Sequence, residues 1–265
     1  MSHADVNGLS LYYEEHGSGE PLVLLHGGIS AGEMFEAILP ELSAQRRVIT
    51  VDLQGHGGTA DVDRPLRPQT MADDIAALIE HLGLPQADVM GYSLGGMVAL
   101  RTALQHPERV RRLVLVSVGC RRDGSHPEVV EAMDHFSPEL AGVLEQSPLY
   151  ERYSRLAPHV EDWPVLIAKT SELLKDDNDW TAETEGLETP TMLVFADADS
   201  VRPAHIVEFY GLLGGGLRDA SWDGSLRPTP RLAILPGTTH YDIYASPALA
   251  PAVIGFLDAP AAEPA

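Results

Sequence analysis

The chain has 265 residues, 44% of them hydrophobic, which is enough for one large domain with a substantial core. Its formal net charge of −21 argues against a nucleic-acid-binding protein, because phosphate contacts require clustered Lys and Arg, and it disfavours anionic membranes and polyanionic substrates. The single cysteine, Cys120, excludes an intrachain disulfide.

The beginning of the chain predicts a β-hairpin. Asn7–Gly8 separates two short strand-like pieces, and the second, residues 9–15, alternates its apolar side chains. No basic segment followed by an apolar run opens the chain, and no stretch approaches the ~18 apolar residues of a membrane span. We therefore expect a soluble, cytoplasmic protein without a secretory signal.

Short apolar runs then alternate with segments of helical periodicity. Continuous apolar runs suit strands that are buried on both faces of a parallel sheet. The predicted strands cover residues 21–25, 47–53, 87–92, 111–118, 191–196 and 231–235. The predicted helices cover residues 31–44, 70–83, 94–106 and 203–213. This alternation predicts an α/β class with a mostly parallel, doubly wound sheet and helices on both of its faces.

One long segment interrupts the alternation. Residues 119–189 show several helical pieces and no convincing strand, which predicts a helical cap, or lid, inserted between late strands. The sheet core is then expected to comprise residues 1–118 and 190–259, followed by a flexible tail at 260–265. A Gly- and Pro-rich loop at 214–230 precedes the last strand, so we expect it at the amino ends of the strands, away from the ligand-binding edge.

The stretch "GYSLGG" places Ser93 in a G-x-S-x-G pattern between a predicted strand and a predicted helix. This context predicts a nucleophile elbow, in which a strained turn lifts the serine hydroxyl above the sheet and small neighbours avoid a collision. The alternative is a serine that merely caps a helix in a glycine-rich turn.

Further candidates favour the nucleophile. A serine hydroxyl requires a base, which is oriented in turn by a third group. Acidic residues in "FADADSVRP" follow one late strand, and His240 in "PGTTHYD" follows the last strand. Upstream, "LLHGG" ends an early strand, where a backbone N–H is suited to bind an oxyanion. These elements occur in the order that a Ser–acid–His triad requires in this type of fold.

With these motifs the sequence resembles the α/β-hydrolase-fold serine hydrolases over nearly its whole length. The resemblance rests on "LLHGG" (24–28), "VDLQGHGGT" (51–59), "GYSLGG" (91–96), "DADSVRP" (197–203) and "GTTH" (237–240). It implies Ser93 as nucleophile, His240 as base, and the backbone N–H groups of Gly28 and Leu94 as the oxyanion hole. The chain departs from the usual pattern at Ala196 and Thr239, where glycine is frequent.

The acidic member of the triad is either Asp197 or Asp199. Pro203 suits the first turn of the next helix, so the acid must lie on the loop 196–202. The resemblance favours the aspartate four residues before that proline, Asp199, and leaves Asp197 as a loop carboxylate.

Other signals are set aside. "GHGGTA" (55–60) fits a dinucleotide-binding pattern, but no helical segment follows it directly. The histidines lack metal-ligand spacing, so we predict neither a metal nor a cofactor. His26 is expected to brace the loop before the oxyanion hole, His205 to lie on the surface or rim, and Cys120 to pack.

The predicted function is cleavage of a carboxylic ester or lactone through an acyl-enzyme, as in a carboxylesterase or lactonase. A cofactor-free perhydrolase and a carbon–carbon bond hydrolase with the same triad remain alternatives, and a non-catalytic binding protein of the same fold is a third.

The substrate is expected to be a small molecule. Aromatic residues in the cap suit a bulky or cyclic group, including a macrocyclic lactone. The candidate substrate-binding residues are Gly27, Ile29, Tyr92, Phe136, Tyr153, Trp163 and Tyr241. The sequence gives no indication of the oligomeric state.

Overall fold

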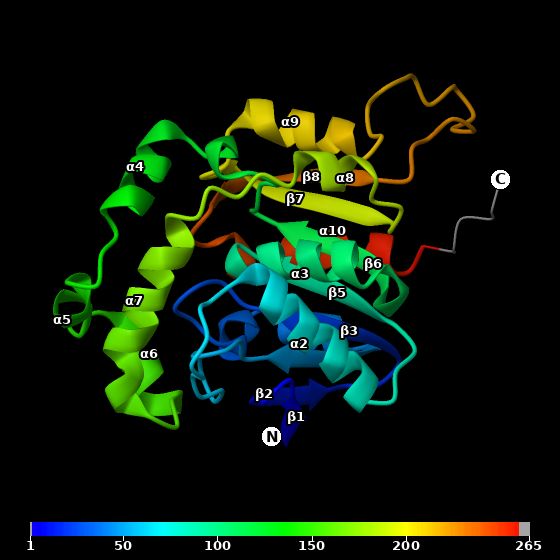
Figure 1. Cartoon of the computed structure of the whole chain (residues 1–265). Coiled ribbons are helices and arrows are strands. Elements are labelled where there is room, and N and C mark those ends of the chain that lie inside the picture. Colours follow the sequence, from blue (N-terminus) through cyan, green and yellow to red (C-terminus); the bar gives the residue numbers. More distant parts are fainter. Residues whose placement is uncertain (1, 260–265) are drawn as a thin grey trace.

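The computed structural model describes residues 2–259 and contains one eight-stranded sheet in the order β1-β2-β4-β3-β5-β6-β7-β8 (Figure 1). Strands β3 to β8 run parallel to one another, and β2 pairs antiparallel with both β1 and β4. The strands are β1 (Ser2–Val6), β2 (Leu9–His16), β3 (Glu20–Leu25), β4 (Arg46–Val51), β5 (Ala87–Tyr92), β6 (Val110–Val116), β7 (Thr191–Ala198) and β8 (Arg231–Thr239). The predicted α/β class and all the predicted strands are confirmed.

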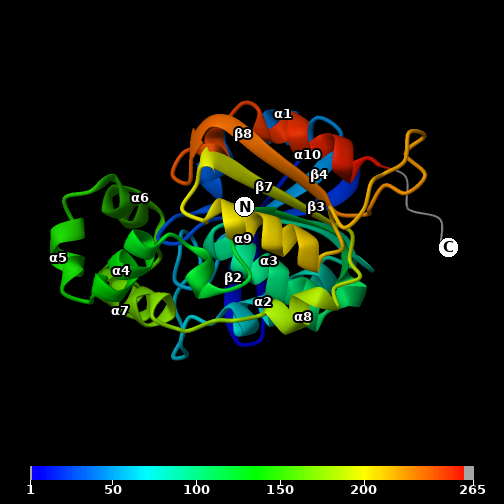
Figure 2. The same cartoon turned by 90° about the horizontal axis from the view of Figure 1, so that it is seen from above.

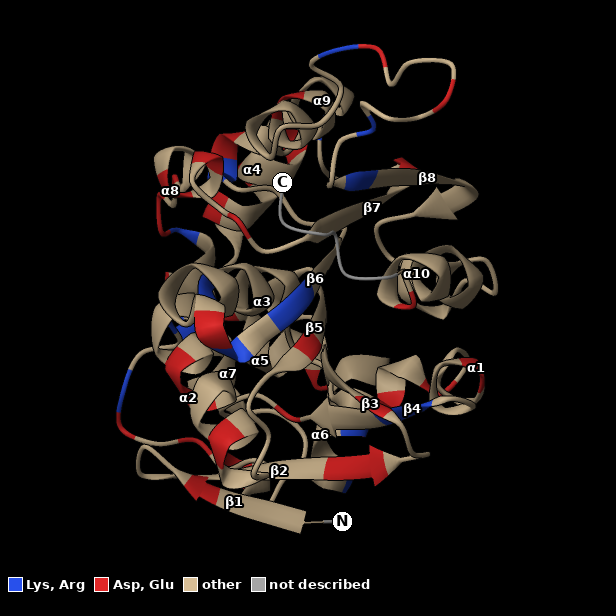
Figure 3. Cartoon of the chain, turned by 90° about the vertical axis from the view of Figure 1, so that its right-hand side faces the viewer, with Lys and Arg blue, Asp and Glu red and all other residues tan. Residues whose placement is uncertain are grey.

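Helices cover both faces of the sheet (Figures 2 and 3). Helices α2 (Pro68–His81), α3 (Leu94–Gln105) and α9 (Pro203–Leu212) pack on one face, where α8 (Thr181–Glu185) lies beside α9. Helices α1 (Leu39–Ser43) and α10 (Leu249–Leu257) pack on the other. In β5, Val89 faces the first layer and its neighbour Met90 faces the second. This explains why the strand sequences are continuously apolar.

The helices of the structure differ from those predicted at two places. The single helix expected at 31–44 is divided into a 3₁₀-helix (Gly32–Phe35) and the short helix α1. Pro40 lies in the first turn of α1, where its missing N–H is tolerated but where it cannot continue a preceding helix. Helix α10 was not predicted, because its sequence "LAPAVIGFL" is apolar throughout and lacks a polar face that would reveal the helical period.

Between β6 and β7 the chain leaves the sheet and forms a group of helices on one side of the molecule (Figures 1 and 2). These are α4 (Pro127–His135), α5 (Leu140–Leu144), α6 (Pro148–Leu156) and α7 (Trp163–Leu174). Salt bridges join this group to the sheet core: Arg152 and Arg155 of α6 bind Glu33, and Lys169 of α7 binds Asp61 at 2.6 Å. The loop at 214–230 lies on the opposite side of the molecule (Figure 1).

The predicted tail at 260–265 lies outside the described residues. Within residues 2–259, no helix combines the length and the apolar character that crossing a bilayer requires. Asp and Glu residues occur in strands β1 and β2 and in helices α2 and α8 (Figure 3), in keeping with the strongly negative net charge.

A buried charge cluster lies at the amino end of β5, away from the carboxyl ends of the strands. The Asp88 carboxylate is fully buried and accepts hydrogen bonds from Arg46 Nη1 at 2.9 Å and from Arg111 Nε at 2.8 Å and Nη2 at 2.6 Å. Breaking a buried ion pair on one side leaves an uncompensated charge in a medium of low dielectric constant.

We predict that Asp88→Ala lowers the free energy of unfolding by about 3–5 kcal/mol, because Arg46 and Arg111 lose their shared carboxylate. Urea denaturation measures this loss. Glu80→Ala serves as the control, because it removes an exposed carboxylate that pairs with Arg109 at the surface and is expected to cost less than about 1 kcal/mol. Equal losses in the two variants would contradict the assignment of the Asp88 cluster to stability.

Candidate active site

Ser93 occupies a strained turn between β5, which ends at Tyr92, and α3, which begins at Leu94. Its backbone has φ 52° and ψ −116°, a conformation that costs a non-glycine residue about 1–3 kcal/mol. A Cβ on Gly91 would lie 2.0 Å from the carbonyl oxygen of Gly95, and a Cβ on Gly95 would lie 2.2 Å from that of Leu25. Glycine is therefore required at both positions, as the elbow pattern predicts.

His240 and Asp199 follow the last two strands and approach each other. The Nδ1 atom of His240 lies 3.4 Å from Asp199 Oδ1 and 2.9 Å from the hydroxyl of Ser200. Asp199 Oδ2 also accepts hydrogen bonds from the Ser117 hydroxyl at 2.6 Å and from the backbone N–H of Ala196 at 2.8 Å. The carboxylate is thus held by groups from the ends of both β6 and β7.

The surroundings of Asp199 keep it ionised although its side chain is only 1% exposed. Burial by itself would raise the pKa of Asp199, but the hydrogen bonds from His240, Ser117 and Ala196 outweigh it and hold the pKa below its ordinary value. A negative charge is consequently present beside His240 at neutral pH.

Asp197, the alternative acid, faces a different partner. Its carboxylate accepts hydrogen bonds from the backbone N–H groups of Gly237 at 2.9 Å and Thr238 at 3.1 Å. The first of these bonds contributes most to lowering the pKa of Asp197. The side chain therefore fixes the end of β8 just before His240, and it is Asp199 that the structure brings to the histidine.

Tyr92 contacts His240 through a hydrogen bond and through its ring. Its hydroxyl donates a hydrogen bond to the backbone carbonyl of His240 at 2.6 Å, and the two rings lie 5.4 Å apart. Ser93 and His240 line the same cavity, but no hydrogen bond joins their side chains among the described residues. Catalytic hydrogen bonds are often long before a substrate binds.

The loop after β3 brings Gly28 to the cavity beside Leu94. A Cβ on Gly28 would lie 3.9 Å from the Leu94 side chain, so the backbones of the two predicted oxyanion donors are neighbours. The next residue, Ile29, has a φ of 52°, which is strained for a β-branched side chain. As expected, His26 braces this loop: Nδ1 lies 2.7 Å from the carbonyl of Gly27, and Nε2 accepts the N–H of Leu53 at 3.0 Å.

A second buried histidine packs against His26. The rings of His26 and His56 lie 5.1 Å apart, and both are buried. Burial lowers the pKa of His26 to about 4. Burial and the neighbouring His26 lower the pKa of His56 to about 3. Both rings are therefore neutral at pH 7, and the Nε2 atom of His56 lacks a hydrogen-bond partner among the described residues.

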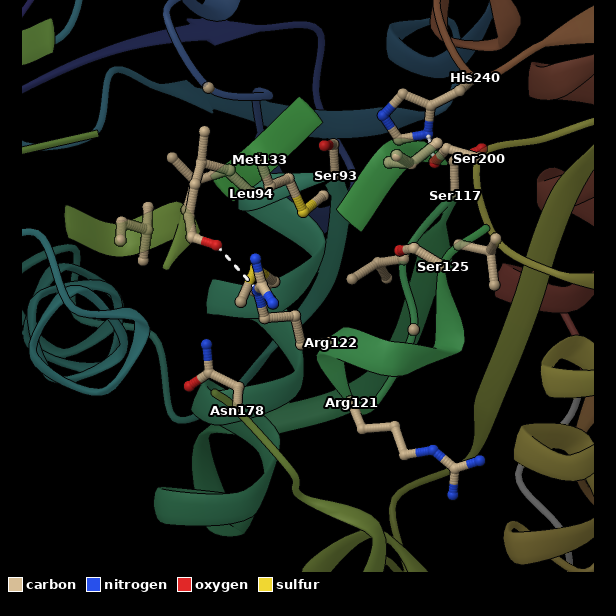
Figure 4. Close-up of a pocket in the computed structure, with 18 of the residues that line it drawn as sticks. Ser93, Leu94, Ser117, Arg121, Arg122, Ser125, Met133, Asn178, Ser200 and His240 are labelled. Carbon is tan, nitrogen blue, oxygen red and sulfur yellow. Dashed lines mark hydrogen bonds between the residues drawn. The ribbon is translucent and has the colours of Figure 1, made fainter. Parts of the chain in front are cut away.

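The cavity has a volume of about 400 Å³ and lies between the carboxyl ends of the strands and the helical segment (Figure 4). Its walls are mostly apolar. The lining residues from the sheet side include Gly28, Ser93, Leu94, Met97, Ser117, Ser200, His240 and Tyr241, and those from the segment between β6 and β7 include Cys120, Arg121, Arg122, Met133, Phe136, Asn178 and Trp180. Such a volume is typical of a site for a small molecule.

Several predicted substrate-binding residues do not line this cavity. Phe136 and Tyr241 do, but Gly27, Ile29 and Tyr92 are not among its lining residues. Tyr153 and Trp163 are buried inside the helical segment, where their rings are 5.1 Å apart and Trp163 Nε1 donates to the carbonyl of Ala141 at 3.0 Å. The structure therefore places these two aromatics, which were predicted to contact substrate, in the small core of that segment and not in the cavity wall.

Trp180, Met133 and Arg122 do line the cavity, and the sequence analysis missed them as site residues. Trp180 is one of several aromatic residues in the segment, and nothing in its local sequence pattern distinguishes it from Trp163. The difference arises from tertiary packing, since Trp180 lies against helix α3, with the Arg101 guanidinium 5.4 Å from its ring.

His205 was also misplaced. It was expected on the surface or rim, but its side chain is fully buried, with Nε2 3.3 Å from the Cys120 backbone nitrogen and Nδ1 3.1 Å from Glu208 Oε2. Burial raises the pKa of the Cys120 thiol to about 11, which makes it a poor nucleophile. Among residues 2–259, no group of three or more His, Cys, Asp and Glu side chains is arranged to hold a metal ion.

Comparisons with known proteins identify the fold family. A family model described as alpha/beta hydrolase fold matches residues 20–243. The pimeloyl-[acyl-carrier protein] methyl ester esterase of Chromobacterium violaceum is 32% identical over 221 residues, which cover 80% of this chain and 81% of that protein. The 2-hydroxymuconate semialdehyde hydrolase of Pseudomonas sp. (strain CF600) is 37% identical over 113 residues, only 41% of this chain and 40% of that protein. A thermophilic esterase from Thermogutta terrifontis has the same fold, with a TM-score of 0.71 and 22% identity over 97% of this chain and 96% of that one.

The buried histidines predict a pH dependence of stability. An unfolded histidine has a pKa of about 6.5, whereas His56 in the folded protein has a pKa of about 3. As the pH falls below about 6.5, the unfolded chain takes up a proton that the folded chain cannot, so the free energy of unfolding falls.

We predict that His56→Phe, which removes this titration, gains about 2 kcal/mol relative to the wild type when the pH is lowered from about 7 to about 4.5. Urea denaturation at a series of pH values measures the difference. His81→Phe, at the surface end of α2, serves as the control and should follow the wild type. Parallel curves for the wild type and His56→Phe would show that His56 does not titrate as its burial requires.

Proposed function

Since the chain belongs to the α/β hydrolase fold family, we propose that it is a serine hydrolase that cleaves a carboxylic ester or lactone of a small molecule. The main support for this proposal is that the candidate nucleophile and base border the same cavity at the carboxyl ends of the strands. Ser93 in its strained turn and His240 with the ionised Asp199 both border it. In the proposed triad Ser93 is the nucleophile, His240 the base and Asp199 the orienting acid.

The proposed reaction begins with attack of Ser93 Oγ on the carbonyl carbon of the substrate. The Nδ1 side of His240 faces Asp199 and Ser200, which leaves Nε2 to accept the hydroxyl proton. Asp199 stabilises the imidazolium that forms and is not itself protonated. His240 then donates the proton to the leaving alcohol, and water cleaves the acyl-enzyme with the same groups acting again.

The negative charge of the tetrahedral intermediate is proposed to rest on the backbone N–H groups of Gly28 and Leu94. Leu94 is the first residue of α3, where the helix dipole adds to the attraction for an anion. A donor of this kind contributes about 3 kcal/mol to lowering the barrier. The buried neutral His26 would keep the Gly28 donor in place.

Residues 119–189 are proposed to act as a cap over this chemistry. Phe136, Met133 and Trp180 from this segment form apolar walls opposite the sheet, and the salt bridges of Glu33 and Asp61 join the segment to the core. The similarity to a methyl ester esterase over four fifths of the chain supports an ester as the scissile group.

We predict that Ser93→Ala lowers kcat by at least about 1000-fold on p-nitrophenyl esters while the protein remains folded, because alanine fits the same turn. A fluorophosphonate probe should label the wild type and not the variant. Ser125→Ala is the matched control, since Ser125 borders the same cavity and should not affect labelling. Labelling of Ser93→Ala at the wild-type rate would refute the assignment of the nucleophile.

The two aspartates after β7 provide a second test. We predict that Asp199→Asn lowers kcat/KM by up to about four orders of magnitude, because it loses the charge that orients His240. Asp197→Asn, whose side chain binds only backbone N–H groups, should lose less than about tenfold. Steady-state kinetics of both variants on one ester distinguishes them, and a larger loss in Asp197→Asn would reverse the assignment.

A further inference from the structure

The cavity has a charge opposite to that of the chain as a whole. The sequence contains 39 Asp and Glu residues against 18 Lys and Arg, yet two arginines and, in the described part of the chain, no Asp or Glu line the cavity. Its remaining walls are mostly apolar side chains. A ligand that complements this cavity is therefore apolar along most of its length and negatively charged at one position.

The two arginines are not equivalent. Both terminal nitrogens of Arg121 donate to the Glu208 carboxylate at 2.8 Å, and its Nε lies 2.7 Å from Asp123. In Figure 4 the Arg121 guanidinium points away from the centre of the cavity. The Arg121 guanidinium is thus directed at Glu208 and away from the cavity, so it is not positioned to bind a ligand there.

Arg122 is oriented the other way. Its side chain is 16% exposed, and in Figure 4 its guanidinium lies in the middle of the cavity, on the side of Leu94 and Met133 that is away from His240. The Nε atom donates to the carbonyl of Leu174 at 3.0 Å, and Nη2 donates to Asp134 at 2.6 Å. No hydrogen bond of Nη1 occurs among the described residues.

The partner of Arg122 does not cancel its effect inside the cavity. Asp134 is 56% exposed, so water screens its charge, whereas the guanidinium faces apolar walls where an electrostatic interaction is stronger. Arginine remains protonated at any pH of interest and its planar guanidinium matches a carboxylate. The contacts to Leu174 and Asp134 hold the group in one orientation.

We infer that Arg122 binds a carboxylate carried by the substrate. This inference rests on the proposed function and narrows it: the substrate is an ester or lactone with a second, ionised carboxyl group, separated from the scissile carbonyl by an apolar stretch. Phe136 and Met133 would contact that stretch, while the scissile carbonyl lies at Ser93 and the carboxylate at Arg122.

The test uses two matched series of p-nitrophenyl esters with acyl chains of stepwise increasing length. One series ends in a methyl group and the other in a carboxylate. The measured quantity is the ratio of kcat/KM for the acidic ester to that for the neutral ester of equal length. We expect the wild type to favour the acidic ester at one or more lengths.

Arg122→Gln should lower this ratio by about 10- to 100-fold, the usual effect of losing a hydrogen bond between charged groups. Arg121→Gln is the matched control and should keep the wild-type ratio, because Arg121 is paired with Glu208. Arg122→Lys should give an intermediate ratio, since it keeps the charge and loses the planar guanidinium. If Arg122→Gln does not fold, Arg122→Lys tests the inference in its place. A wild type that prefers the neutral ester at every length, or a ratio that is unchanged in the Arg122 variants, would overturn the inference.

The failure of the inference can be separated from that of the proposed function. Hydrolysis of neutral esters without an effect of Arg122 on the ratio overturns the inference alone. If the wild type hydrolyses neither series and the fluorophosphonate probe does not label Ser93, the proposed function fails. Calorimetric titration with adipate then decides on the carboxylate site: binding that Arg122→Gln abolishes and Arg121→Gln preserves supports it, and any other result overturns it.

Discussion

The close approach of helix α3 to the end of strand β3 is the constraint on which the rest of the site depends. A side chain at Gly95 would collide with the carbonyl oxygens of Leu25 and His26, so the helix can begin only where glycine allows the two backbones to touch. The chain must then turn within one residue after β5, which forces Ser93 to a positive φ. The same approach places the N–H of Leu94 beside the loop that carries Gly28. One packing contact thus fixes the direction of Ser93, the proposed nucleophile, and the positions of the proposed oxyanion donors.

The buried polar groups of the site are stabilised by hydrogen bonds to one another. A carboxylate as buried as that of Asp199 would ordinarily favour its protonated form, but Ser117 and the backbone of Ala196 donate to it and keep its pKa low. These donors stand at the ends of β6 and β7, which are adjacent in the sheet. The parallel arrangement therefore supplies Asp199, the proposed triad acid, with hydrogen bonds from the ends of two strands, and the loop after β8 needs only to bring His240 beside it.

The sequence predicted the parts of the molecule that short-range patterns determine. Continuous apolar runs located strands β3 to β8, the Asn7–Gly8 turn with its alternating strand located the hairpin, and the glycines around Ser93 located the turn before α3. The patterns did not show which side chains of the segment between β6 and β7 face the cavity, because Trp163 and Trp180 differ only in what packs against them after folding. His205 was misplaced for a related reason: it lies on a helix that the patterns identified, but its burial depends on Cys120 and on glycines after β6 that leave room for its ring.

The sheet and the inserted segment position different parts of the proposed site, and Arg122 shows this difference. It stands a few residues after β6, where the chain leaves the sheet, yet Leu174 of α7 and Asp134 of α4 hold its guanidinium. Its backbone N–H donates to the carbonyl of Asn178 at 2.8 Å, so the inserted segment holds both the backbone and the charged group of Arg122. Changes in how α4 and α7 pack would move this charge relative to Ser93 without disturbing the Ser93 turn or the contacts of Asp199. A fold built in this way can alter which substrate it accepts while the geometry of its reaction stays the same, because the two depend on different contacts.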